Sequence, residues 1–270
     1  MPFRSDKILN SKAHIVYTEP MNHRASLILT AAVSVAAGLA FGSIFSEAGS
    51  TTDLPAGASA VSMSIVSIVE TASTSPTVTV EYPQFPKLPA ALNSAVASAT
   101  MTRLADFRRS AAETMKARAA TGDSAAVIPD SAYYFIASWQ PSQVNPRYVS
   151  FIERYSSYAG GANGNEQLKT FNYDIARRRF VTLSDLFPDA PDYLGEIATM
   201  ARSQLASSMN FASAGHVPLS MMDAGTAPDR TNFKNFTFTN ELVTIYFPKY
   251  AVAPGSFGEQ HLVIRRRSVK

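Results

Sequence analysis

The stretch YVSFIERYSSY, residues 148–158, decides the fold of the largest part of this chain. Apolar and aromatic side chains recur along it between polar ones, at Val149, Phe151, Ile152, Tyr155 and Tyr158. Alternation of this kind is typical of a β-strand that buries at least one face. The run GGANG, residues 160–164, ends the pattern with glycines, which take positive φ without steric cost. We therefore predict a strand that ends in a tight connection.

Similar alternation, bounded by proline, glycine or asparagine, occurs on both sides of this strand. It predicts further strands at 77–82, 133–140, 169–175, 179–183, 235–239, 241–247 and 260–266. Two other segments, 89–119 and 191–208, repeat apolar residues at helical spacing, and each begins with a proline. Two main helices over a strand-rich antiparallel body predict an α+β fold.

An uncharged run near the N-terminus, ASLILTAAVSVAAGLAFGSIF at residues 25–45, predicts a transmembrane helix before this body. Basic residues precede it at Arg4, Lys7, Lys12 and Arg24, and none follows until Lys87. Positive charge stays on the cytoplasmic side, so residues 1–24 are expected inside and the rest outside. A cleaved secretory signal has the same basic and apolar order, with small-residue sites at 40–42 and 58–60. The protein is therefore predicted to be single-pass in the cell membrane, or secreted after cleavage.

The rest of the chain is predicted to fall into three parts. Residues 46–75 are rich in Ser, Thr, Ala and Gly and are predicted to be a flexible linker. Alternation over 61–69 leaves open that a first strand begins there instead. We expect a smaller α+β module over 76–130 and a larger one over 131–270.

Composition excludes several kinds of chemistry. The chain of 270 residues has no cysteine, so it has no disulfide, thiol nucleophile or cysteine metal site. A net charge of +3 is a weak sign of nucleic-acid binding, and the four histidines form no local zinc motif. We predict no metal, no cofactor and no nucleic-acid partner.

Four motifs, in order, resemble one known pair of domains. They are EYPQF at 81–85 with Leu92-Asn93 opening a helix, YAGGANG at 158–164 with NYD at 172–174, LSDLF at 183–187, and FPKYAVAPGSFG at 247–258. Together they are similar to the paired extracytoplasmic domains of the RsiV-like family, over roughly residues 76–266. That family includes the lysozyme-sensing anti-sigma factor RsiV and some peptidoglycan deacetylases.

The resemblance implies an extracellular binding or sensing module with an α+β fold, without an established enzymatic activity of its own. Some relatives bind lysozyme, and others stand beside peptidoglycan enzymes. Many relatives carry histidine where this chain has Asn163, which puts an imidazole-dependent role there in doubt. The arm 1–24 is short for a sigma-binding domain, so an anti-sigma role is not favoured.

The glycine-rich loop and the aromatic residues around it are the candidate ligand site. Backbone N–H groups of such a loop can hold an anion, and aromatic faces pack on sugar rings or partner proteins. The candidate ligand-binding residues are Tyr155, Tyr158, Gly160, Gly161, Asn163, Tyr173, Tyr250 and Phe257. The alternatives are a strand connection for the glycines and core packing for the tyrosines.

The predicted function is a membrane-anchored extracytoplasmic binding or sensing domain of the bacterial cell envelope, recognising a protein such as lysozyme or peptidoglycan itself. One alternative is a peptidoglycan or glycan hydrolase, or an accessory to one, with Glu153, Glu166, Asp174 and Asp185 as candidate acids. A structural envelope protein is another. The arginine runs 177–179 and 265–267 could meet an anionic polymer or stay solvated. No catalytic residue is assigned, and a turn or capping role is the favoured interpretation of Asp185.

Overall fold

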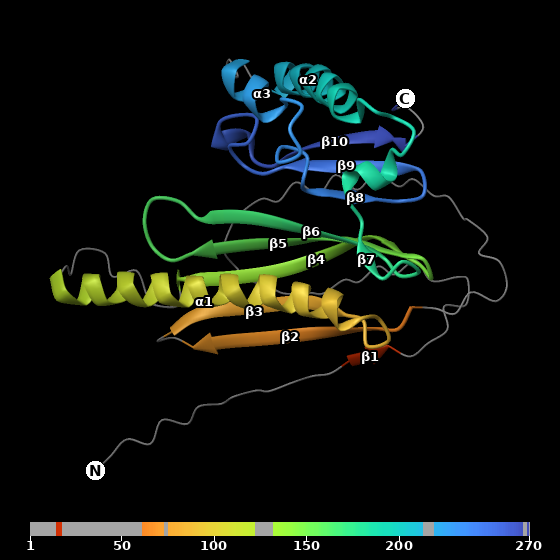
Figure 1. Cartoon of the computed structure of the whole chain (residues 1–270). Coiled ribbons are helices and arrows are strands. Elements are labelled where there is room, and N and C mark those ends of the chain that lie inside the picture. Colours follow the sequence, from red (N-terminus) through yellow and green to blue (C-terminus); the bar gives the residue numbers. More distant parts are fainter. Residues whose placement is uncertain are drawn as a thin grey trace, which may run out of the picture.

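The computed structural model describes residues 15–17, 61–72, 75–121, 132–212, 219–266 and 269, which form two sheets and three α-helices (Figure 1). The α+β class is confirmed, and α3 (Leu219–Gly225) is a short helix that was not predicted. Among these residues no helix is both long and apolar enough to cross a membrane. The predicted anchor at 25–45 lies outside the described residues.

The first sheet has seven strands in chain order. They are β1 (Ile15–Tyr17), β2 (Met63–Ala72), β3 (Ser75–Gln84), β4 (Tyr134–Val144), β5 (Tyr148–Tyr158), β6 (Asn165–Asp174) and β7 (Arg179–Phe180). One pair departs from the predicted antiparallel pattern, because β3 runs parallel to β4 with Thr77 beside Tyr134. A parallel pair needs a long crossover, which here contains α1 (Ala90–Thr121).

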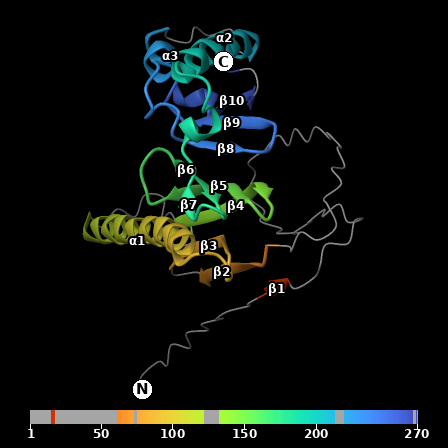
Figure 2. The same cartoon turned by 45° about the vertical axis from the view of Figure 1, so that its right-hand side comes forward.

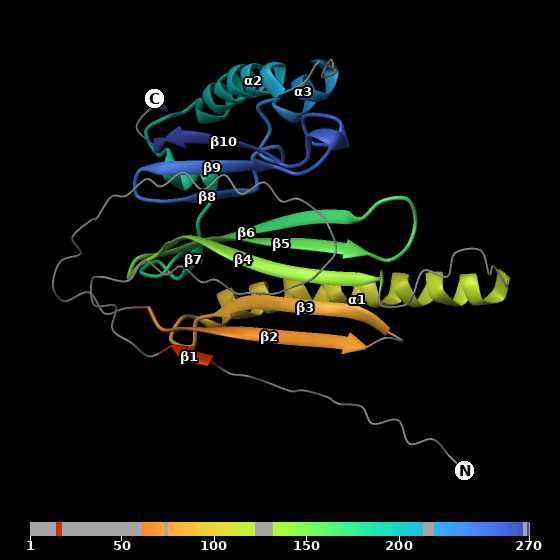
Figure 3. The same cartoon turned by 180° about the vertical axis from the view of Figure 1, so that it is seen from behind.

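Helix α1 covers one face of this sheet. Its side chains Leu92, Val96 and Leu104 are fully buried against the strands. Figure 3, the view from behind, shows the strands in front of α1. Asn93 fixes the entry to the helix, since its side chain accepts from Phe85 N at 2.8 Å and donates to Phe85 O at 3.0 Å. The EYPQF motif is thereby tied to the helix that follows it.

The second sheet, in the order β10-β9-β8, packs with the remaining helices around its own core. We call the first sheet with α1 the first unit. The second unit consists of η2 (Leu183–Leu186), α2 (Tyr193–Ala212), α3, β8 (Phe236–Phe238), β9 (Leu242–Phe247), η3 (Gly255–Phe257) and β10 (Gln260–Arg265). Ile197 of α2 and Ile245 of β9 are fully buried in that core. Figures 1 and 2 place α2 and α3 at the end of the molecule remote from β2.

Strand β5 serves both units, because its two faces are covered by different elements. Val149, Phe151 and Tyr155 belong to the core under α1. Ser150 and Arg154 point the other way, since successive strand residues face opposite sides, and they bond to the second unit. Ile152, on the same side of the strand as Ser150 and Arg154, is accordingly as fully buried as Val149 and Phe151 on the other side.

Two sequence predictions about organisation meet the structure here. Of the alternatives left open for 61–69, the strand is correct, because β2 begins at Met63 within the proposed linker. The first sheet also joins strands from both sides of residue 130, where the module boundary was predicted. Strand β1 pairs with β2 although the predicted anchor stands between them in the chain.

Candidate functional site

A cavity of about 230 Å³ lies between α1 and the β5–β6 hairpin. Three predicted ligand residues line it: Tyr155, Gly160 and Asn163. Its apolar wall includes Phe107 of α1 and Phe135 of β4, and its polar groups include Asn165 and Gln167 of β6. Figure 1 shows the hairpin curving beside the C-terminal half of α1. Polar and apolar groups line this cavity in about equal measure, and a concave surface that combines the two can hold a small molecule.

Arg103 of α1 is held in a fixed position at this cavity. Its guanidinium carbon lies 4.4 Å from the ring centroid of Tyr155, within cation–π distance. Its Nη1 donates to Ala99 O at 2.9 Å, and its Nε donates to Gln167 Oε1 at 3.0 Å. The side chain is therefore fixed by a backbone carbonyl, a ring and an amide rather than by a carboxylate.

Beneath Tyr155 lies a buried carboxyl group, Glu153, with 1% of its surface exposed. Its Oε2 accepts hydrogen bonds from the Tyr155 hydroxyl and from Thr100 Oγ1, the latter at 3.2 Å. Its Oε1 has no partner in the described part of the chain. Burial raises the pKa of Glu153 to about 7, against the lowering by these two hydrogen bonds and by the Arg103 charge. Burial and the Glu153 charge likewise raise the pKa of Tyr155.

The glycine-rich loop packs directly on α1. Gly160 has φ +101°, and a Cβ there would lie 2.5 Å from Thr114 Cγ2. Gly161 has φ +97° with nothing within 4 Å of a Cβ. Tyr158 closes the loop by donating its hydroxyl to Gly161 O at 3.0 Å. The loop thus makes the tight connection between β5 and β6, and Gly160 brings it close to the helix.

The other predicted aromatic residues do not reach the cavity. Tyr173 is 1% exposed in the core under α1, where its hydroxyl has no described partner. Phe257 packs half-buried against the second core. Tyr250 also belongs to the second unit and is 61% exposed, with φ +70°. The predicted site is therefore split: the cavity takes Tyr155, Gly160 and Asn163, with Tyr158 and Gly161 beside them.

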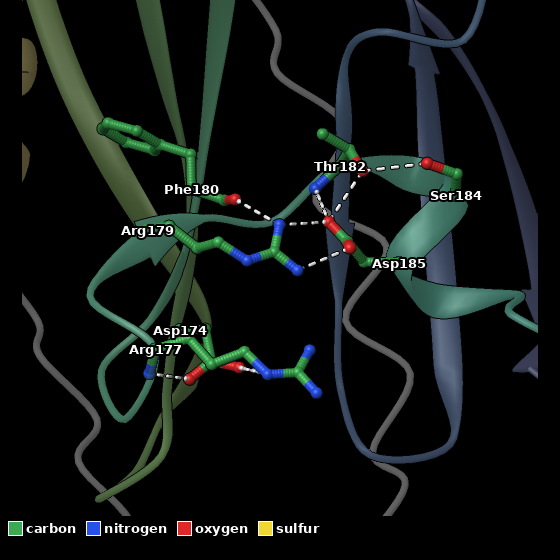
Figure 4. A network of polar contacts seen from close by, with 7 residues as sticks. All are labelled: Asp174, Arg177, Arg179, Phe180, Thr182, Ser184 and Asp185. Carbon is green, nitrogen blue, oxygen red and sulfur yellow. Dashed lines mark hydrogen bonds and ion pairs between the residues drawn. The ribbon is translucent and has the colours of Figure 1, made fainter.

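The candidate carboxylates are also dispersed. Glu153 is buried under Tyr155, and Glu166 is exposed on the hairpin. Figure 4 shows Asp174 at the end of β6 and Asp185 on η2, each paired with an arginine. No group of three or more His, Asp or Glu among the described residues is arranged to hold a metal ion.

Asp185 has the capping role that was offered for it. Its Oδ2 accepts from Thr182 N at 2.8 Å and from Arg179 Nη1 at 3.0 Å, and its Oδ1 accepts from Arg179 Nη2 at 2.6 Å (Figure 4). These bonds, the Arg179 pair foremost, hold the pKa of Asp185 well below its usual range. The charge of Arg179 is accordingly engaged within the turn.

Sequence reasoning missed Arg103, Asn165 and Gln167. Arg103 and Gln167 are 64 residues apart, and their bond depends on how α1 crosses the sheet. One signal was present: Arg103, Phe107 and Ser110 stand at helical spacing, and all three line the cavity. A polar residue inside the apolar stripe of a helix marks such a place.

Comparisons with known proteins now give the family context. Residues 184–267 match the model of a family described as a protein of unknown function, DUF3298. The chain is 32% identical over 122 residues to the peptidoglycan-N-acetylmuramic acid deacetylase PdaC of Bacillus subtilis, which is 45% of this chain and 25% of PdaC. It is 24% identical over 133 residues to the esterase Rv3036c of Mycobacterium tuberculosis, covering 49% of this chain and 54% of the esterase. The chain thus spans from a quarter to about half the length of these relatives.

A solved structure shows the same fold. The crystal structure of a DUF3298 family member from Bacteroides fragilis superposes with a TM-score of 0.56 at 20% identity, covering 76% of this chain and 91% of the other. The predicted family resemblance, including that to a peptidoglycan deacetylase, is confirmed. The chain is therefore similar to the DUF3298 family over residues 184–267.

Proposed function

We propose that the described part of this chain is an extracytoplasmic binding domain of the bacterial cell envelope whose ligand is a glycan of peptidoglycan. The observation that carries the proposal is the cavity beside Tyr155, which Asn163 and Asn165 line together with the rings of Phe107 and Phe135. Amide side chains offer both donors and acceptors, which sugar hydroxyl and N-acetyl groups need. The similarity to PdaC, a protein named for a peptidoglycan substrate, supports this ligand class.

Binding is favoured over hydrolysis by the state of the carboxylates. Glu153, the acid beneath the cavity, is covered by Tyr155 and has 1% of its surface exposed. Asp185 is engaged by Arg179 and Thr182. A general acid must come within hydrogen-bond reach of the reacting group, which neither position provides. Asp106, which lines the cavity, is paired with Arg109.

The test is calorimetric titration of the full chain, in detergent, with soluble peptidoglycan fragments. Asn163→Ala and Asn165→Ala each remove one amide from the cavity, and we expect each to weaken binding by about tenfold. Gln143→Ala is the control, because Gln143 is a side-chain amide that bonds to Asn240 instead. Absence of binding to every fragment, or equal binding by all three variants, would overturn the proposal.

A protein ligand of the lysozyme type is a second candidate, at a different place. Tyr250 exposes 61% of its surface and has φ +70°, a backbone conformation that costs about 1–3 kcal/mol for a non-glycine residue. Its ring rests on Gly255, where a Cβ would lie 2.4 Å from the ring. An exposed, preorganised tyrosine is the type of residue that dominates protein interfaces.

Titration with a lysozyme tests this second candidate. Tyr250→Ala is expected to abolish binding, whereas Leu219→Ala, which alters another exposed side chain of the second unit, is expected to leave it unchanged. If wild-type protein binds no lysozyme, or if Tyr250→Ala binds it normally, this candidate is discarded.

A further inference from the structure

We infer that the cavity recognises a carboxylate through Arg103, so that its ligand is a pyranose ring bearing an acid group rather than a neutral sugar. The inference rests on the proposed glycan function and narrows its ligand class. It depends on three properties of Arg103: a fixed position, a lack of any internal counter-charge at contact distance, and a place on the cavity wall.

The position of Arg103 is fixed before any ligand arrives. Ala99 O accepts a hydrogen bond from Nη1, and Gln167 Oε1 accepts one from Nε. The ring centroid of Tyr155 lies 4.4 Å from the guanidinium carbon. Neither hydrogen bond uses Nη2, which remains a donor for a ligand. A preorganised guanidinium loses less conformational entropy when it binds a carboxylate than a mobile one does.

The charge of Arg103 is not neutralised by contact. No carboxylate lies within ion-pair distance of it in the part of the chain that the structure describes. Asp106 also lines the cavity, but its Oδ1 is paired with Arg109. Glu153 acts on Arg103 only at longer range, since its Oε2 is bonded to Tyr155 and Thr100. An acid group on the ligand would therefore meet a cation that has no carboxylate at contact distance, and with it could form a charge-assisted hydrogen bond.

The cavity also limits the size of the ligand. Its volume of about 230 Å³ lies below the range of about 300–1,000 Å³ typical of drug-sized ligands. One sugar ring fits this limit better than an extended oligosaccharide. Two acidic sugars supply the chemistry: N-acetylmuramic acid, with its carboxylate on an ether arm, and a uronic acid, with its carboxylate on the ring.

The experiment compares acid and ester by calorimetry on the full chain. The ligands are N-acetylmuramic acid, its methyl ester, glucuronic acid and N-acetylglucosamine. We expect wild-type protein to bind at least one of the two acids about tenfold or more tightly than the uncharged sugars, as expected for a charged hydrogen bond. Whichever of the two acids binds more tightly shows whether the site takes a carboxylate on an ether arm or one on the ring.

Three variants test the role of Arg103. Arg103→Gln is expected to abolish the preference for acid, and Arg108→Gln, which alters an arginine of α1 paired with Glu70 of β2 outside the cavity, is expected to keep it. Gln167→Glu supplies an internal carboxylate where Nε now bonds an amide. We expect Gln167→Glu to abolish the preference for acid while the protein stays folded, and a thermal melt verifies the folding. This variant keeps the inference testable even if Arg103→Gln fails to fold.

The outcomes separate the inference from the proposed function. If wild-type protein binds acid and ester equally, or if Gln167→Glu keeps the acid preference, the inference is wrong. Should Asn165→Ala still weaken binding of the neutral sugar in that case, the glycan function stands without it. If no sugar and no peptidoglycan fragment binds, both are wrong.

Discussion

Ser150 and Asn172 face each other across β5 and β6 and together hold the edge strand of the second sheet. Ser150 Oγ donates to Asn172 Oδ1 at 2.7 Å, and Asn172 Nδ2 donates to Phe236 O at 2.7 Å. Phe238 N in turn donates to Ser150 Oγ at 2.9 Å. Both side chains are buried, so the outer backbone groups of β8 find partners without water.

Breaking this connection is expected to destabilise the whole chain. Ser150→Ala or Asn172→Ala leaves buried polar groups without partners, which costs about 1–3 kcal/mol of unfolding free energy. The double variant should lose less than the sum, because the two residues share one network. Urea unfolding measures this, with Ser156→Ala on the same strand as the control. Fully additive losses would show that the two side chains act independently.

Stability is expected to fall as the pH rises from about 4.5 to about 7. The pKa of Glu153 is raised by burial from 4.5 to about 7, so the folded state binds this proton more tightly than the unfolded chain. Protonated Glu153 contributes on the order of 3 kcal/mol to the free energy of unfolding, and this contribution is fully present below the pKa of the unfolded chain. It is lost as the pH rises through the pKa of the folded state. Thermal or urea unfolding across this pH range measures the slope.

Glu153→Gln should remove that slope. Glutamine keeps an oxygen that accepts from Thr100 and Tyr155 but carries no titrating group. The variant is expected to be more stable than wild type at pH 8 and to lose the dependence between pH 5 and 7. Glu166→Gln, on the exposed part of the hairpin, should keep the wild-type slope. A slope that persists in Glu153→Gln would assign the effect to another group.

The two loop glycines should respond differently to alanine. Both have positive φ, which costs an alanine about 1 kcal/mol. Gly160→Ala adds a clash with Thr114 Cγ2 at 2.5 Å, whereas a Cβ on Gly161 meets open space. We expect the greater loss of unfolding free energy for Gly160→Ala, and Thr114→Ala in the same chain should restore part of it. Equal losses at both positions would mean that the loop moves away from α1 freely.

The absence of cysteine makes the membrane topology directly testable. Single variants Ser5→Cys and Ser203→Cys place one thiol in the N-terminal arm and one on exposed α2. If residues 25–45 form the anchor, a membrane-impermeant maleimide labels Ser203→Cys in intact cells and Ser5→Cys only after lysis. If the segment is instead a cleaved signal, the measured mass of the mature protein lacks the N-terminal arm.

Two other labelling results would contradict the predicted anchor or the predicted export. Labelling at both positions in intact cells would put the arm and the domain on one side, as pairing of β1 with β2 requires. A shielded thiol at position 203 in intact cells would contradict export altogether.

Local pattern was enough to predict most of the strands, both long helices and the capping role of Asp185. Periods of two and about 3.6 residues record which side of an element is buried, and that information is local. It does not say which element does the burying. The odd and even apolar residues of β5 looked like one imperfect alternation, although they belong to a strand covered on both faces.

The sequence by itself determined most of the strands, both long helices, the absence of thiol chemistry and the expectation of export, because these follow from residue type and spacing along the chain. Only the tertiary structure decided that β3 lies parallel to β4 and that Arg103 meets Tyr155 and Gln167 over one cavity. The physical reason is that the apolar stripe of α1 packs on the sheet, and this packing fixes the position of every polar residue on the same face of the helix. That position depends on the shape of the sheet beneath, which no local window of sequence contains.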